Sequence, residues 1–237
     1  MEKHAEEKWT KHRKTAIIVG VLFIIGTVAG ILSLVFSGPV VDVPDYLDQV
    51  AAHSNRLILA ALCVLTMSLS LALIPVVVYP VLRKHNETLA LGYVIFRGAL
   101  ETFTCIATVI SWLVLITFAQ GLIGTGGVEA LSIEATGAAL KDASIWIGKI
   151  GVIVFILGAL MFYTVLYRSQ LVPRWISGWG LIAAMPFLAA GFLVMFGIIG
   201  HMSTVDSLLQ LPLALQEMVL AVWLIVKGFN PEALPGR

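Results

Sequence analysis

Charged side chains are scarce in this sequence. Only 12% of its 237 residues are Asp, Glu, Lys or Arg, and 59% are hydrophobic. In soluble domains about a quarter of the residues are charged. This composition excludes a water-soluble globule. Several apolar runs also reach the ~20 residues that a membrane-spanning helix needs, so the chain is predicted to be a membrane protein.

Cysteine and the common catalytic motifs are also rare or missing. Cys63 and Cys105, the two cysteines, both lie inside apolar runs, so the sequence predicts no disulfide framework. No HExxH, CxxC, G-x-S-x-G or phosphate-binding loop occurs, and these are the patterns that would indicate a metal, redox, hydrolase or nucleotide site. We therefore expect no catalytic residue, no metal and no cofactor, and we lean against an enzyme.

Six apolar runs predict an all-α polytopic membrane protein, folded as a bundle of six transmembrane helices. Residues 1–14 form a basic tail, residues 15–227 the membrane domain and residues 228–237 a second tail. Residues 121–142 are glycine-rich and weakly amphipathic, which favours a surface helix or a flexible cap. The predicted spans cover residues 15–36, 57–82, 89–118, 143–167, 179–200 and 208–226.

The first predicted span contains a GxxxG match at Gly26 and Gly30. Two glycines at this spacing allow a neighbouring helix to approach closely. The alternative is that the match has no special role, because glycine is common in membrane helices. The sequence leaves both interpretations open.

Lysine and arginine are distributed unevenly between the two sides of the predicted bundle. Eleven lie in the two tails, directly after the sixth span, and in the loops after the second and fourth spans, while the other side holds Lys141, with Arg56 at a helix mouth. Basic loops stay in the cytoplasm, so both termini are predicted to be cytoplasmic. The basic loops suit contact with anionic lipid; we expect membrane lipids as partners and no nucleic acid.

Two opposite charges, Arg97 and Glu101, lie four residues apart inside the third span. A charge near the centre of a bilayer costs at least ~3 kcal/mol, so both side chains need shelter from other helices. Counting ~1.5 Å per residue places Arg97 level with Glu217 of the sixth span, and Glu101 level with Lys149 of the fourth. The depths predict the pairs Arg97–Glu217 and Glu101–Lys149, while the spacing also permits a pair between Arg97 and Glu101.

Further polar residues lie at helical spacing around these charges. Thr104 and Thr108 continue the face of Arg97, and Asn55 begins a polar face of the second span. His53 and His201 lie on one side outside the spans, but they show no spacing typical of a haem or metal site. The predicted ligand-binding or ion-pair network comprises Arg97, Glu101, Lys149, Glu217, Gln216, Asn55, Thr104 and Thr108.

Ionisable residues inside a membrane indicate a functional site by default. Our main hypothesis is a cavity that binds or transports a small polar or amphiphilic molecule, with proton coupling through Glu101 or Glu217. One alternative is an intramembrane enzyme on a lipid-like substrate, with either acid as general acid–base and Arg97 holding an anionic headgroup. Another is a sensor or accessory subunit whose charges only fix helix register. A homo-oligomer is compatible with each hypothesis.

Several short segments form a pattern over nearly the whole chain. They are YPVLRKHN at 79–86, ALGY at 90–93 followed by Arg97 and Glu101, PRW at 173–175 with GWG at 178–180, and LP at 211–212 followed by Glu217, Trp223 and KGF at 227–229. Together they resemble a bacterial family of six-span integral membrane proteins, catalogued as a domain of unknown function. The resemblance implies the bacterial cytoplasmic membrane as the location and transfers no activity.

Overall fold

A computed structural model describes residues 2–124 and 126–234, with side chains from residue 12 onward, and this part of the chain contains no strand. Six of its helical segments are long and apolar enough to cross a membrane, which confirms the all-α, six-span prediction. The elements are α1 (Glu2–Val41), α2 (Tyr46–Ala52), α3 (Ser54–Leu82), α4 (Glu87–Tyr93), the π-helical segment η1 (Val94–Leu100), α5 (Glu101–Leu122), α6 (Gly127–Ser169), α7 (Arg174–Met195), α8 (Thr204–Val226) and the 3-10 turn η2 (Pro231–Ala233).

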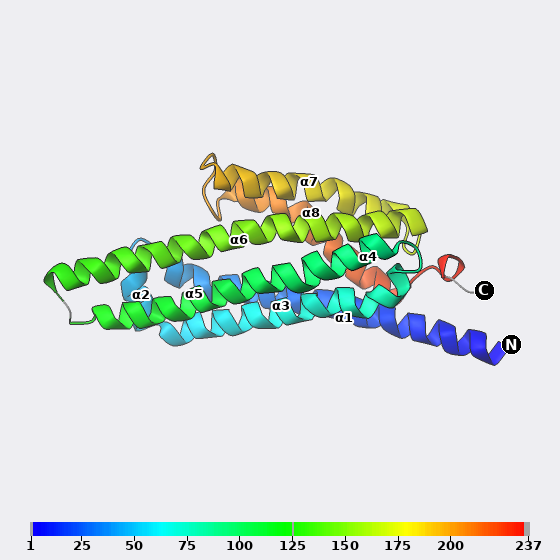
Figure 1. The fold of residues 1–237 in the computed structure, drawn as a ribbon, viewed down its shortest axis with the longest axis horizontal. Helices are drawn as coiled ribbons and strands as arrows, with labels where there is room; N and C mark the ends of the chain where they lie inside the picture. Colours follow the sequence, from blue (N-terminus) through cyan, green and yellow to red (C-terminus); the bar gives the residue numbers. More distant parts are fainter. Residues whose placement is uncertain (1, 125, 235–237) are drawn as a thin grey trace.

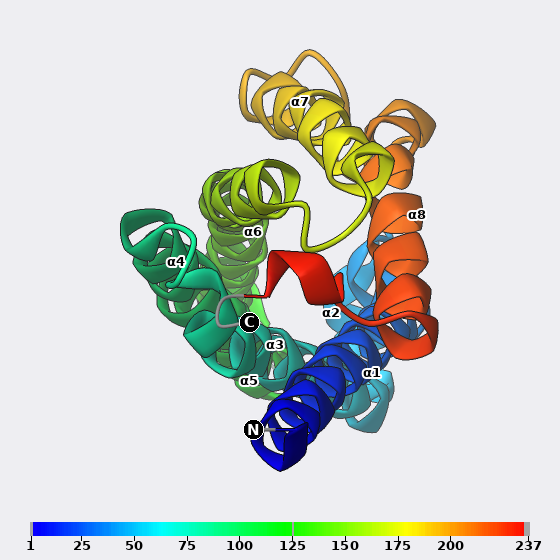
Figure 2. The same cartoon turned by 90° about the vertical axis from the view of Figure 1, so that its right-hand side faces the viewer.

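The spans form a closed ring. Each packs against two neighbours in the order α1, α3, α5, α6, α7, α8 and back to α1, as the view along the bundle shows (Figure 2). α4 and η1 continue into α5 and complete the third span. Both chain ends lie at one end of the bundle, here called the terminal end, and the α5–α6 loop lies at the far end (Figure 1). That the terminal end faces the cytoplasm stays a prediction.

α6 is much longer than the fourth span expected from the sequence. Its 43 residues correspond to roughly 64 Å at 1.5 Å per residue, whereas a bilayer with its headgroups measures about 40–45 Å. Residues 127–142, expected as a surface helix or flexible cap, instead continue the span without a break. α6 therefore reaches beyond the α7–α8 hairpin at the far end (Figure 1).

The GxxxG match in α1 lies at a close helix contact. A Cβ atom added at Gly26 would be 2.7 Å from Leu71 of α3, and one added at Gly30 would be 2.9 Å from the sulfur of Met67. A side chain at either position would have to displace the side chain of Leu71 or Met67. The two glycines therefore bring α1 directly against α3, which confirms the first interpretation of the motif.

The terminal end is tightly tied together. The guanidinium of Arg13 donates hydrogen bonds to the carbonyl oxygens of Leu224, Ile225 and Val226 at 3.1, 2.7 and 3.0 Å, which satisfies carbonyls that the end of α8 leaves free. Beyond α8, the backbone nitrogen of Asn230 donates to the carbonyl of Leu171 at 2.8 Å. The C-terminal segment thus lies across this end of the ring (Figure 2).

Candidate functional site

Arg97 lies in the middle of η1, a seven-residue π-helical stretch. Such geometry is rare inside α-helices and often occurs at functional sites. Gly158 of α6 lies directly behind it, because a Cβ atom there would be 3.1 Å from the backbone nitrogen of Arg97. The close contact of α6 with η1 leaves Arg97 only 3% exposed.

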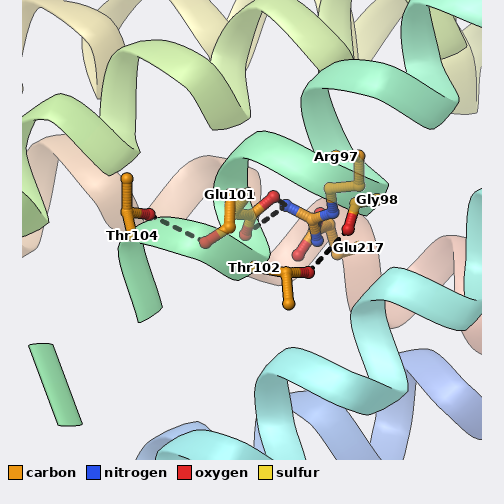
Figure 3. A network of polar contacts seen from close by, with 6 residues as sticks. All are labelled: Arg97, Gly98, Glu101, Thr102, Thr104 and Glu217. Atoms are coloured by element: carbon orange, nitrogen blue, oxygen red, sulfur yellow. Dashed lines mark hydrogen bonds and ion pairs between the residues drawn. The ribbon is translucent and has the colours of Figure 1, made fainter. Parts of the chain in front are cut away.

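The guanidinium of Arg97 forms ion pairs with two carboxylates. Nη1 of Arg97 donates a hydrogen bond to Oε1 of Glu101 at 3.2 Å and lies 3.1 Å from Oε2, while Nη2 donates to Oε1 of Glu217 at 3.3 Å (Figure 3). The ring of Phe155 lies 4.2 Å from the Arg97 Cζ atom. The predicted Arg97–Glu217 pair and the pair within the helix are therefore both present. We call Arg97, Glu101 and Glu217 the arginine cluster.

The predicted pair between Glu101 and Lys149 is wrong. Nζ of Lys149 lies 3.2 Å from Oδ2 of Asp206, and both side chains are almost completely buried. The predicted depth of Lys149 depends on a fourth span that begins at residue 143, but α6 begins at Gly127, so the start of the predicted span is not the start of the helix. Asp206, which falls between the fifth and sixth predicted spans, lies in the first turn of α8.

Asp206 is a site residue that the sequence analysis missed. Its two oxygens accept hydrogen bonds from the Gln210 side chain at 2.6 Å and from the backbone nitrogen of Met202 at 3.2 Å, besides the contact with Lys149. The sequence held a sign of this, since Ser203 and Asp206 form the S-x-x-D pattern of a helix start. Oγ of Ser203 accepts a hydrogen bond from the Asp206 backbone nitrogen at 3.2 Å. We call Lys149 and Asp206 the lysine pair.

A cavity of about 380 Å³ lies between the arginine cluster and the lysine pair, within the ~300–1,000 Å³ typical of small-molecule sites. Glu101 lines one part of it, and Lys149 and Asp206 line another. Much of the remaining wall is apolar or aromatic. This part includes Val64, Met67, Trp112, Leu115, Val152, Phe155 and Phe187.

Thr104 and Thr108 lie on the cavity wall, as the polar stripe on α5 predicted. Their hydroxyls donate to backbone carbonyls of the same helix, Thr104 to Glu101 at 2.8 Å and Thr108 to Thr104 at 3.1 Å. Each hydroxyl hydrogen is therefore already engaged, as Figure 3 shows for Thr104. A ligand here would find hydroxyl oxygens that act as acceptors.

The other predicted members lie away from the cavity wall. Gln216 is fully buried, and its Nε2 donates to the carbonyl of Ile176 in α7 at 3.0 Å, while its Oε1 has no hydrogen-bond partner among the described residues. Asn55 is exposed in the first turn of α3. The structure does not bring it to either cluster, because α3 begins at Ser54 and Asn55 stays at the helix mouth.

The two histidines lie in different surroundings. His201 lines the cavity, and desolvation by its neighbours, followed by the charge of Lys149, lowers its pKa, which favours a neutral ring at pH 7. His53 is exposed, with Nδ1 3.3 Å from the Gln49 carbonyl, and is not among the lining residues. Among the side chains that the structure describes, from residue 12 onward, no group of three or more His, Cys, Asp or Glu could hold a metal ion.

The comparison with protein families finds a match over most of the chain. A family model described as a domain of unknown function (DUF4386) matches residues 18–228. This range includes every residue of the arginine cluster and the lysine pair. No curated protein and no solved structure matches the chain.

Proposed function

Because the chain belongs to the DUF4386 family, which brings no assigned activity, we propose a function from the site alone. The protein binds a small polar or amphiphilic molecule in the cavity and carries it across the membrane, and Glu101 is the group through which this process is coupled to protons. The protein lies in a cell membrane, and the six helices long enough to span it support this location. The bacterial cytoplasmic membrane is part of the proposal.

The position of Glu101 is the observation that carries this proposal. Its carboxylate is paired with the buried Arg97 and also lines the cavity. A network that only fixed helix register would need no cavity beside its acid. Glu217 pairs with the same guanidinium but is not among the lining residues, so we assign proton exchange to Glu101.

Filling the cavity tests the proposal. Gly148 lines it, and a Cβ atom added there meets no atom within 4 Å, so Gly148→Leu should occupy the cavity without disturbing the helix packing. Gly121→Leu is the matched control, because a Cβ atom is equally unobstructed there and residue 121 is not part of the lining. Both glycines lie within helices.

The readout is native mass spectrometry of protein purified in lipid nanodiscs, with extraction of the bound molecules. We expect one small molecule to accompany wild type and Gly121→Leu and to be lost from Gly148→Leu. Equal retention in all three proteins would contradict the proposal. In that case the charges would only hold the helices together.

Orientation decides from which side the cavity is reached. A cysteine introduced at Gly126, in the α5–α6 loop, should react with an impermeant thiol reagent on intact cells, and one at Glu232 should not. Cys63 and Cys105 are free and only partly exposed, so a background lacking both is the control. Labelling at residue 232 alone would reverse the predicted orientation.

A further inference from the structure

The buried charges do not balance. The arginine cluster and the lysine pair contain three acids, Glu101, Glu217 and Asp206, against two bases, Arg97 and Lys149. The lysine pair is matched one to one, so the extra negative charge belongs to the arginine cluster. An unmatched charge in a low-dielectric interior is costly. The extra carboxylate therefore requires either a proton or a cation.

The remaining wall of the cavity does not supply this cation. Lys141 and Asp42 both line the cavity and offset one another. The Lys141 ammonium lies 4.3 Å from the centre of the Tyr46 ring, so it is also held by an aromatic face. His201 favours its neutral form, as described above. The imbalance of one negative charge is thus a property of the whole cavity.

The groups that surround Glu101 come from several elements. Arg97 is the one cation in this set, and Glu217 shares it. The wall residues that α1, α3 and α7 supply, such as Ser33, Met67 and Phe187, do not titrate. The titratable and charged groups facing the cluster are Arg97 and Cys105 of the third span, Glu217 of α8, Tyr93 of α4 and Tyr163 of α6, with Lys149 of α6 further along the cavity.

The wall chemistry favours an organic cation over a metal ion. Calcium needs six to eight oxygen ligands, and magnesium needs near-octahedral oxygen coordination, whereas the lining is mainly apolar and the described residues contain no metal-binding group of three. Trp112 and Phe187 line the same cavity as Glu101. Aromatic faces attract organic cations, so carboxylate and rings together match one ligand class.

We propose that the ligand of this cavity is an organic cation, such as a lipophilic amine or quaternary ammonium, which replaces a proton on Glu101 when it binds. This inference rests on the proposed function and names its substrate class. In the empty protein the Glu101 carboxyl group keeps its O–H bond. On binding, that bond breaks, the proton leaves to water and the carboxylate remains beside the cation, so charge is conserved at each step.

The test uses tetraphenylphosphonium, a cation that cannot itself release a proton, and wild-type protein in nanodiscs. Binding is measured by equilibrium dialysis across a pH series, and proton release by an indicator in weakly buffered solution. We expect up to one proton released per bound cation, and affinity that rises with pH by up to about tenfold per unit while Glu101 is protonated. Glu101→Gln should bind about tenfold more weakly or worse and release no proton.

Three controls define the signal. Empty nanodiscs give the partition into lipid, Gly148→Leu should remove the remaining binding, and tetraphenylborate, an anion of the same shape, should not compete. Proton release from wild type needs no variant, so poor folding of Glu101→Gln would not affect this measurement. Tetraphenylphosphonium binding that is absent in wild type, or that is equal in Glu101→Gln and releases no proton, would overturn the inference.

The two proposals fail separately. If the molecule that Gly148→Leu excludes is neutral or anionic, the binding function stands and the cation inference is wrong. If Gly148→Leu retains the molecule as well as wild type does, the cavity is not the binding site and both proposals fall.

Discussion

The lysine pair and the arginine cluster bury the same kinds of charge in different ways. Lys149 and Asp206 are matched one to one, and Asp206 also accepts two hydrogen bonds from its own helix and the preceding turn. Arg97 divides its guanidinium between two acids, whose side chains keep 14% and 15% exposure against 1% for Asp206. A buried ion pair with matched charges and further hydrogen bonds to its carboxylate indicates a structural role. A cluster with one excess negative charge and partly exposed acids indicates a site that can bind a positively charged group.

Removing Lys149 should have the largest effect on stability. Lys149→Met leaves the Asp206 carboxylate buried at 1% exposure without its cation. Breaking a buried pair in this way typically costs about 3–5 kcal/mol. The measurement is the free energy of unfolding in mixed detergent micelles, followed by circular dichroism.

A double variant shows whether this cost comes from the pair. Asp206→Asn added to Lys149→Met removes both charges and keeps an oxygen that can accept from Gln210 or Met202, so much of the loss should be recovered. If the two effects simply add, with a coupling energy below about 0.5 kcal/mol, the lysine pair does not hold the bundle together.

Replacing Gly158 at the contact between α6 and η1 should have an intermediate effect on the free energy of unfolding. A Cβ atom there lies 3.1 Å from the Arg97 nitrogen and 3.3 Å from its Cβ atom, so Gly158→Leu forces α6 away from η1 and should cost about 1–3 kcal/mol. Gly148→Leu, on the same helix but facing open space, should stay within about 0.5 kcal/mol of wild type. Equal losses in the two variants would mean that α6 does not depend on this close approach.

The sequence predicted the arginine cluster well because a short loop fixes its depth. Only Arg83–Asn86 separates α3 from α4, and the Asn86 side chain accepts a hydrogen bond from the Leu89 backbone nitrogen at 2.9 Å, which starts the helix at Glu87. Residue counting from that point is reliable, and the counted level of Arg97 matched that of Glu217. The π-helical turn at Arg97 was not predicted, since no residue pattern distinguishes it from an α-helix.

The lysine pair was mispredicted because its two helices begin where composition is ambiguous. Residues 127–142 contain glycine, threonine and charges that are as typical of a loop as of a helix outside the bilayer. Tertiary packing holds these residues in a helix, because α6 continues alongside α5 at the far end and its Gly137 and Lys141 contact Leu47 and Tyr46 of α2. The S-x-x-D start of α8 would have placed Asp206 in the helix, whereas the apolar run alone begins the sixth span only at residue 208.

Neutralising Glu217 should have the smallest effect on stability, although Glu217 also lies in a buried ion pair. In Glu217→Gln, Arg97 keeps Glu101 at 3.1 Å, and the amide oxygen can still accept a hydrogen bond from Nη2. The buried set then contains two acids and two bases, so no charge is stranded and the change should stay within about 1 kcal/mol. Because the extra negative charge is gone, Glu101 should remain ionised beside Arg97, and binding of tetraphenylphosphonium should become weaker and release fewer protons than in wild type.

The unfolding and proton-release measurements together decide how the arginine cluster works. A loss of about 3–5 kcal/mol in Glu217→Gln, as large as that expected for Lys149→Met, would identify Glu217 as the principal partner of Arg97. The cluster would then be a second matched ion pair, with Glu101 as a bystander. A small loss with unchanged proton release would place the exchangeable proton on Glu101 whatever the state of Glu217. Only a small loss with reduced proton release supports one guanidinium shared between two acids, one of which gives up its proton to the ligand.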